Sequence, residues 1–325
     1  MHALATATLL SLLLSVSILS ACGRPNDATP KVEGFITADD GVKLYYVSKG
    51  SGRDVVVAPM ALFLEEHLAP LANGRRIVFY DPRNRGRSDA ADLSTISLDR
   101  QIEDLEDLRE ALGLEKMALI GWSGLGMEMA AYTIRHPDRV TRLIQISPVP
   151  PAESIMTAAG DTRADKVDQE AVAALDARAR AGEFEDDPAE YCRLDRALTL
   201  PANFVDTSLI SEVADACVYE NEWPKNFWPY IGALLASFQG YDWRNDLETL
   251  EVPRLIIHGR EDGIPLAGAE AWAAGYPTAR LLIVSPAGHF PYIEQKDLVI
   301  DAADAFLGGK WPKGAQLLPA TAEAP

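Results

Sequence analysis

Positively charged side chains are in the minority in this chain of 325 residues, with 30 Lys and Arg against 48 Asp and Glu and a formal net charge of −18. A protein that grips nucleic acid without regard to sequence needs a basic face to displace counterions from phosphates. We therefore expect no nucleic-acid partner. His and Cys are also scarce, at five and three residues, and are too scattered for a zinc site of the CxxC type. We expect no metal.

The chain has ample apolar residues and length. Hydrophobic residues make up 48% of the chain, enough to bury a full core, which excludes a disordered or low-complexity protein. The 325 residues allow one large α/β domain or two small ones.

Charged residues are absent from one stretch, the apolar run from Ala3 to Ala21. Such a run followed by polar residues is typical of a secretory signal, so we expect residues 1–21 to be a signal peptide. The alternative is an uncleaved anchor, because about 19 apolar residues nearly span a bilayer. Either way we expect an exported, membrane-tethered protein.

The end of this run, Leu19 to Cys22, resembles the lipobox of bacterial lipoproteins. The resemblance implies that Cys22 becomes the lipidated N-terminus and that residues 22–33 form a linker. It also implies that the membrane partner is reached through a lipid anchor. Gly23 after the Cys resembles a signal for the outer membrane, with the protein facing the periplasm.

Two cysteines remain once Cys22 is set aside, Cys192 and Cys217. They form an even pair in a compartment where disulfides persist, so we expect them to be bonded. Two unpaired buried cysteines are the alternative.

Strand and helix patterns alternate along the chain after residue 33. Residues 34–49 predict an opening hairpin around an Asp-Asp-Gly turn. Helical patterns at 97–112 and 127–136 lie between short apolar runs of the type that is buried on both faces of a sheet. These runs cover residues 54–58, 76–80, 117–120, 143–146, 255–257 and 281–284. The pattern predicts an α/β protein with a mostly parallel sheet flanked by helices.

The strand pattern stops from Pro150 to about Asp246. We therefore expect a helical lid over residues 150–246, inserted after the sixth strand into a core made of residues 34–149 and 247–309. The Pro- and Ala-rich stretch 310–325 predicts a flexible tail.

Residues with catalytic chemistry follow three of the predicted strands. Ser123 lies between Gly121 and Gly124, at a step from strand to helix. This arrangement is typical of a nucleophile elbow, although a structural tight turn would also explain it. Asp262 and His289 each follow a later strand, and open α/β sheets place their sites at these strand ends.

On these residues the chain resembles the α/β-hydrolase superfamily over residues 34–309. The loop 81–89, the Gly-His-Phe-Pro stretch at 288–291 and the lid resemble most the branch related to proline iminopeptidases and its esterase relatives. The resemblance implies Ser123 as nucleophile, His289 as general base and acid, and Asp262 as the carboxylate that orients His289. Glu261 is the alternative to Asp262.

Two positions depart from the family pattern. Leu125 stands two positions after the nucleophile, where the family usually has a small residue. The His-Gly pair that usually follows the third strand is missing, and the sequence there runs Val57-Ala58-Pro59-Met60. Because Pro59 has no N–H, one oxyanion donor must come from Met60 or Ala61, and we favour Met60. The other would be the N–H of Gly124.

Lid residues bear on the substrate. Glu220 and Glu222 are candidates to hold a substrate ammonium, as an iminopeptidase requires, or they are part of a solvated surface. The aromatic side chains of Trp223 and Trp228 are either lid core or a substrate wall. Trp122, beside the nucleophile, is open to the same two interpretations.

Together these features predict a serine hydrolase that works through an acyl-enzyme without metal or organic cofactor. The expected substrate is a small carboxylic ester or a short N-terminal prolyl peptide. The rival hypothesis is a ligand-binding protein of the same fold with little or no turnover, which the departures at Leu125 and Pro59 leave open.

Overall fold

The computed structural model describes residues 31–320. The expected signal peptide and Cys22 lie outside this part of the chain. Eight strands form one sheet in the order β1-β2-β4-β3-β5-β6-β7-β8. The strands are β1 (Lys31–Thr37), β2 (Lys43–Gly50), β3 (Val55–Pro59), β4 (Arg76–Tyr80), β5 (Met117–Trp122), β6 (Val140–Ile146), β7 (Arg254–Gly259) and β8 (Ala279–Val284).

The sheet is mixed, and its strand directions follow the predicted pattern. β1 and β2 form an antiparallel hairpin, and β2 also runs antiparallel to β4. All other neighbours are parallel. The hairpin begins at Lys31, three residues before the predicted start, because polar Lys31 and Glu33 can pair in an exposed edge strand without any apolar signal.

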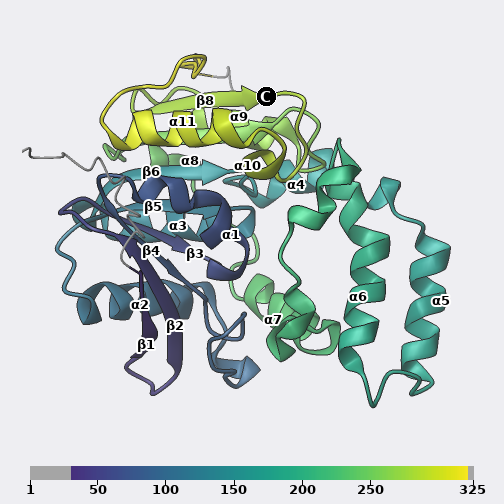
Figure 1. Cartoon of the computed structure of the whole chain (residues 1–325). Coiled ribbons are helices and arrows are strands. Elements are labelled where there is room, and N and C mark those ends of the chain that lie inside the picture. Colours follow the sequence, from purple (N-terminus) through teal and green to yellow (C-terminus); the bar gives the residue numbers. More distant parts are fainter. Residues whose placement is uncertain (1–30, 321–325) are drawn as a thin grey trace, which may run out of the picture.

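Helices connect the strands and cover both faces of the sheet (Figure 1). The α-helices are α1 (Ala61–Leu68), α2 (Leu98–Ala111), α3 (Gly124–Arg135), α4 (Glu153–Ala159), α5 (Gln169–Arg180), α6 (Pro188–Thr199), α7 (Pro224–Ala236), α8 (Arg244–Glu248), α9 (Leu266–Ala273), α10 (Pro291–Glu294) and α11 (Lys296–Leu307). The 3₁₀ turns are η1 (Ala69–Ala72), η2 (Leu93–Thr95), η3 (Pro137–Arg139), η4 (Ala164–Lys166), η5 (Leu200–Asn203), η6 (Thr207–Glu212), η7 (Ala216–Val218) and η8 (Glu220–Glu222).

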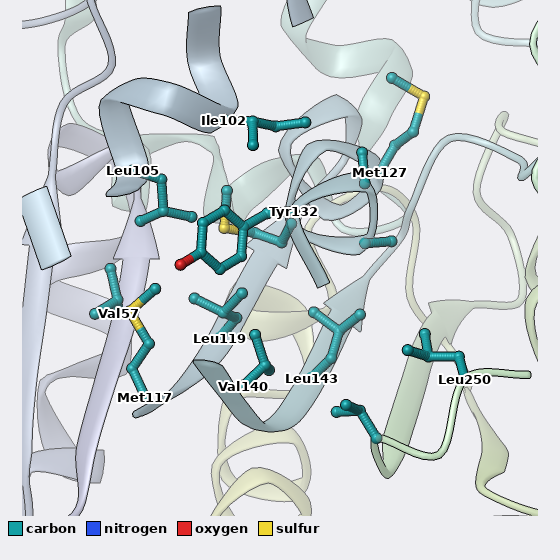
Figure 2. Close-up of a cluster of buried hydrophobic side chains, with 14 of the residues drawn as sticks. Val57, Ile102, Leu105, Met117, Leu119, Met127, Tyr132, Val140, Leu143 and Leu250 are labelled. Atoms are coloured by element: carbon teal, nitrogen blue, oxygen red, sulfur yellow. The ribbon is translucent and has the colours of Figure 1, made fainter. Parts of the chain in front are cut away.

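The core consists of two apolar layers, one on each face of the sheet. Successive residues of a strand point to opposite faces, so Val57 and Leu119 pack with α2, α3 and α9, while Val56 and Ile120 pack with α1 and α11. Figure 2 shows part of the first layer, where Tyr132 of α3 lies against Leu105 of α2. Burial on both faces explains why the central strands are almost continuously apolar.

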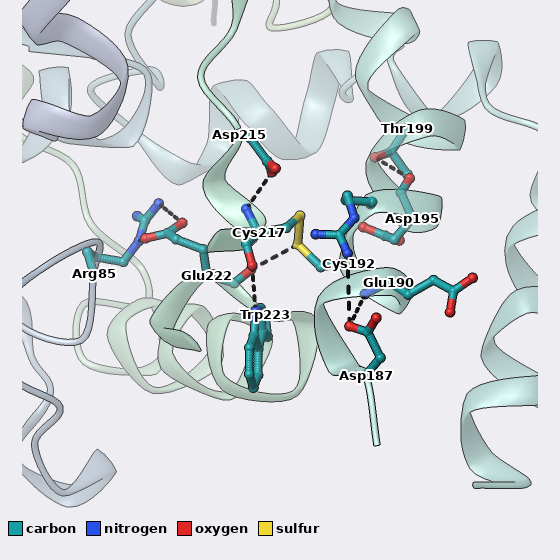
Figure 3. Close-up of a disulfide and its surroundings, with 11 residues drawn as sticks. Arg85, Asp187, Glu190, Cys192, Asp195, Thr199, Asp215, Cys217, Glu222 and Trp223 are labelled. Atoms are coloured by element: carbon teal, nitrogen blue, oxygen red, sulfur yellow. Dashed lines mark hydrogen bonds and ion pairs between the residues drawn. A yellow bond between two sulfur atoms is a disulfide. The ribbon is translucent and has the colours of Figure 1, made fainter. Parts of the chain in front are cut away.

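The segment between β6 and β7 is helical, as expected for the lid. In Figure 1 the α5 and α6 pair stands beside the core, and α7 lies between α6 and the core. Cys192 of α6 and Cys217 of η7 form the expected disulfide, with their Cα atoms 5.7 Å apart (Figure 3). The bridge therefore fixes α6 to the stretch that leads into η8.

Residues 310–320 differ from the expected flexible tail. Gln316 pairs with Leu281 of β8 through two backbone hydrogen bonds of 2.8 and 2.9 Å, and the Trp311 ring packs on Phe306 of α11. Composition alone concealed these contacts, because backbone pairing needs no apolar side chains. Of the helices between residues 31 and 320, none has both the length and the hydropathy to cross a membrane.

Candidate active site

Ser123, Asp262 and His289 meet at one edge of the sheet. Ser123 follows β5, Asp262 lies three residues after β7, and His289 lies five residues after β8. These three strands are parallel neighbours or near neighbours in the sheet, so their carboxyl ends share an edge.

A continuous hydrogen-bonded chain joins the three side chains. Ser123 Oγ lies 3.0 Å from His289 Nε2, and His289 Nδ1 lies 2.9 and 3.1 Å from the two oxygens of Asp262. Ser123 is partly exposed, whereas the side chains of His289 and Asp262 are buried. The hydroxyl is therefore accessible, while its two partners are shielded from water.

Ser123 occupies a sharp turn between β5 and α3. Its φ of 59° lies in the left-handed region, which a residue with a side chain adopts only when the surroundings hold it there. Close packing holds it: a Cβ on Gly121 would lie 2.5 Å from the carbonyl oxygen of Leu125 and 2.7 Å from Cα of Gly126. A Cβ on Gly126 would in turn lie 3.0 Å from the carbonyl oxygen of Gly121. The close approach of strand and helix therefore needs glycine at both 121 and 126. The Leu125 side chain packs instead on Met60 and Ala216.

Asp262 is held in place by the turn that contains it. Burial alone would raise the pKa of Asp262, but the neighbouring His289 and the backbone N–H of Ile264, 3.0 Å away, hold the pKa well below its usual range. The adjacent Glu261 accepts hydrogen bonds from Ser285 Oγ and the backbone N–H of Ala287. Glu261 therefore fixes the loop before His289 and is not the partner of the imidazole.

Two residues that the sequence did not single out for this role fix the His289 backbone. The indole N–H of Trp122 donates to the carbonyl oxygen of His289 at 2.8 Å, and the N–H of His289 donates to the carbonyl oxygen of Asn203 at 2.8 Å. Trp122 belongs to the elbow and Asn203 to the lid. No sequence signal marks the Asn203 contact, because it uses a backbone oxygen.

The two N–H groups expected to bind the oxyanion have no acceptor within residues 31–320. They belong to Gly124, the first residue of α3, and to Met60, which follows β3. Met60 is 1% exposed and has a φ of 62°. A buried N–H without an acceptor is rare in folded proteins, so both donors are available to a developing negative charge.

The lid residues proposed as substrate contacts are placed differently from one another. Glu222 is buried and accepts hydrogen bonds from Arg85 Nε at 2.9 Å, Arg85 Nη2 at 3.0 Å and the N–H of Gly86 at 2.9 Å. It is therefore neither solvated nor free to bind an ammonium. Glu220 and Trp228 are exposed, and the indole N–H of Trp223 donates to the carbonyl oxygen of Cys217.

A cation of the lid, Arg196, lies near the aromatic side chains beside the triad. Arg196 of α6 has its guanidinium carbon 5.5 Å from the centre of the Phe63 ring. Phe63 packs edge-on against Trp122, whose ring centre is 5.1 Å from that of His289. Within the described chain, Arg196 has no carboxylate within ion-pair distance and makes no side-chain hydrogen bond. Burial lowers the pKa of Arg196, whereas the carboxylates of Glu222, Asp215 and Asp195 act in the opposite direction.

The described residues contain no cluster of His, Cys, Asp and Glu that could hold a metal ion. What the site offers chemically is a hydroxyl, an imidazole, a buried carboxylate and two free N–H donors. This set can move a proton from the hydroxyl and stabilise an oxyanion.

Comparisons with known proteins agree with the fold described above. A family model described as the alpha/beta hydrolase fold matches residues 60–296. A non-heme chloroperoxidase from Streptomyces lividans is 30% identical over 251 residues, which are 73% of this chain and 85% of that protein. A proline iminopeptidase from Lactobacillus delbrueckii subsp. bulgaricus is 25% identical over 230 residues, covering 69% of this chain and 77% of that protein.

Solved structures show the same fold. An α/β fold family hydrolase from Bacillus anthracis superposes with a TM-score of 0.63 at 19% identity, over 86% of this chain and 99% of that one. An esterase from Exiguobacterium antarcticum gives a TM-score of 0.63 at 20% identity, over 85% of this chain and 100% of that one. The sheet order, the lid after β6 and these matches together establish that the chain belongs to the α/β-hydrolase fold family.

Proposed function

We propose that this protein is a serine hydrolase that cleaves a small carboxylic ester through an acyl-enzyme. The observation that carries the proposal is the unbroken chain from Ser123 Oγ through His289 to Asp262, with contacts of 3.0 and 2.9 Å. Hydrogen-bond contact between nucleophile and base, with a third group orienting the base, is the arrangement that activates a hydroxyl.

The reaction follows from the positions of the groups. His289 Nε2 takes the Ser123 proton as Oγ attacks the ester carbonyl, and later returns it to the leaving alcohol. Asp262 stays ionised at neutral pH because its pKa is held low, so it stabilises the imidazolium that forms. The N–H groups of Gly124 and Met60 would hold the oxyanion. Water then attacks the acyl-enzyme. His289 takes a proton from the water and returns it to Ser123 Oγ as the carboxylic acid leaves.

The electrostatics near Ser123 favour an ester over a prolyl peptide. Recognition of a free ammonium requires an unpaired carboxylate in the lid, and Glu222 is already engaged by Arg85. The lid side chain that packs on Phe63, the neighbour of Trp122, is the cation Arg196, which has no ion-pair partner within residues 31–320. A guanidinium suits a carboxylate, so we propose that the acyl or alcohol part of the substrate carries a negative charge.

Active-site labelling tests the proposed function. A fluorophosphonate probe should form an adduct on Ser123 of the folded protein, and the Ser123→Ala variant should form none. The His289→Ala variant, which keeps the hydroxyl, should label much more slowly. Absence of an adduct on folded protein would contradict the hydrolase proposal and favour a binding protein of the same fold.

A further inference from the structure

A cavity of about 840 Å³ opens at the end of the sheet opposite Ser123. It is lined by residues at the start of β3 and β5, including Val55 and Ala118, whereas Ser123 lies at the end of β5. A strand of five or six residues is roughly 17–20 Å long, so the cavity is separate from the candidate active site.

Four cationic side chains line this cavity: Arg53, Arg75, Lys116 and Arg142. The only acidic side chains among its lining residues are Asp54 and Glu115. Arg75 is paired with Asp304 at 2.7 Å, but Arg53, Lys116 and Arg142 form no ion pair or side-chain hydrogen bond within residues 31–320. Because Asp54 and Glu115 form no ion pair within the described chain either, the lining has three unpaired cations against two unpaired acids, a small positive excess in a chain with a net charge of −18.

The chain enters the fold at the same end of the sheet. In the strand register, Lys31 of β1 lies opposite Lys49 of β2. Gly50 of β2 lies opposite Arg76 of β4, and Arg76 lies opposite Val55 of β3. Lys31 is therefore three strand spacings, or roughly 14 Å, from β3. It follows Cys22 by nine residues, a stretch that spans at most about 30 Å when extended.

We propose that this cavity binds the phosphate group of an anionic phospholipid, so that the basic end of the sheet faces a membrane and Ser123 faces away from it. Guanidinium and ammonium groups are the side chains that hold phosphate. Each cation near an anionic lipid surface strengthens binding by about fivefold. The apolar run Ala3–Ala21 brings the membrane within reach, and the cavity sets the orientation. The proposal does not depend on the hydrolase function.

The test measures orientation, because the apolar N-terminal run can enter any vesicle. Full-length protein with Cys22→Ser receives one fluorophore, at Thr141→Cys beside the cavity or at the exposed Leu235→Cys on the lid. Vesicles of phosphatidylglycerol or phosphatidylcholine carry a quencher on their headgroups. In phosphatidylglycerol vesicles we expect the label at 141 to be quenched several-fold more than the label at 235. In phosphatidylcholine vesicles the difference should be much smaller, since choline neutralises the phosphate and only the N-terminal run then draws this end toward the membrane.

Charge variants make the test specific to the cavity. Arg53→Gln/Lys116→Gln removes two exposed, unpaired cations and should weaken the interaction with phosphatidylglycerol by about 25-fold. Asp54→Asn/Glu115→Gln removes the two acids and should strengthen it. The control Arg178→Gln/Arg193→Gln makes the same charge change on the exposed lid and should have no effect on the label at 141.

Two outcomes would overturn the proposal. Equal quenching at positions 141 and 235 in phosphatidylglycerol would show that the basic end does not face the lipid. Saturable binding of inorganic phosphate or glycerol 3-phosphate without vesicles, lost in Arg53→Gln/Lys116→Gln and unaccompanied by any quenching difference, would assign the cavity to a free phosphate compound instead of a lipid.

Discussion

Arg85 and Glu222 form a buried, two-pronged ion pair although 137 residues separate them in the sequence. Arg85 belongs to the loop after β4, and Glu222 ends η8 of the lid, a few residues from the disulfide (Figure 3). The ion pair therefore attaches the η8 segment of the lid to the core. The disulfide between Cys217 and Cys192 in turn attaches α6 to that segment.

Removing one partner of this pair should destabilise the protein. Glu222→Gln leaves the Arg85 guanidinium buried without a counter-charge, which costs about 3 kcal/mol or more in free energy of unfolding. Urea unfolding followed by tryptophan fluorescence measures the loss. Glu220→Gln, two residues earlier and exposed, is the matched control and should leave stability unchanged. Unaltered stability together with selective loss of prolyl-amide hydrolysis would contradict this structural role and restore Glu222 as an ammonium ligand.

The disulfide should contribute to the stability of the lid. It closes a loop with a sequence separation of 25 residues, and loop entropy gives about 3 kcal/mol for a closure of this size. Cys192→Ala/Cys217→Ala should therefore lower the midpoint of thermal unfolding and make the lid more sensitive to limited proteolysis. Mass spectrometry of an unreduced digest should find the two cysteine peptides linked. Two separate alkylated peptides from unreduced protein would exclude the bond.

Arg196 should determine which ester is preferred. Arg196→Met should reduce kcat/KM for monoethyl adipate, which carries a carboxylate, by about 10- to 100-fold, mainly through KM. Hydrolysis of ethyl hexanoate, which lacks the charge, should change little. Arg193→Met is the control, because Arg193 is exposed on the same helix. Equal losses for both esters would indicate that Arg196 acts only on the lid structure.

Glu128 should make stability depend on pH. This carboxyl on α3 is buried near Arg85 and Tyr230, and burial raises its pKa to about 8. The folded state then keeps a proton that the unfolded chain releases above about pH 4.5. Stability should therefore fall as pH rises from about 4.5 to 8, by up to about 1.4 kcal/mol per pH unit, and should level off above that.

The Glu128→Gln variant removes this titration. Its free energy of unfolding should exceed that of the unaltered protein by an amount that grows between pH 5.5 and pH 8.5, as measured by urea unfolding. Glu251→Gln, at an exposed position, should leave the pH dependence as it is. A difference between Glu128→Gln and the unaltered protein that stays constant over this range would argue against a protonated Glu128.

The sequence predicted the parts of the molecule that local patterns encode. Short apolar runs predicted the central strands because those strands are buried on both faces, and Gly121 with Ser123 predicted the elbow because few residues fit so tight a turn. The positions of Asp262 and His289 followed from the order of strands, since parallel strands end at one edge. This inference required no knowledge of how the lid folds.

Contacts between distant segments could not be predicted in the same way. Glu222 has no local signal that distinguishes it from the exposed Glu220, because its burial depends on Arg85 in another part of the fold. The support that Asn203 gives to His289 is a backbone contact, which any residue type could make. Met60 was inferred as a donor by elimination at Pro59, and the conformation that leaves its N–H free emerges only in three dimensions.

The pairing of Gln316 with Leu281 has a consequence for solubility. β8 is the last strand of the sheet, and an uncovered outer strand offers its backbone groups to a second chain. The two hydrogen bonds from Gln316 occupy part of that edge. A chain shortened at residue 310 would keep the whole candidate active site and yet expose a template for edge-to-edge aggregation. The segment around Gln316 thus covers part of the β8 edge and keeps it from pairing with the sheet of another molecule.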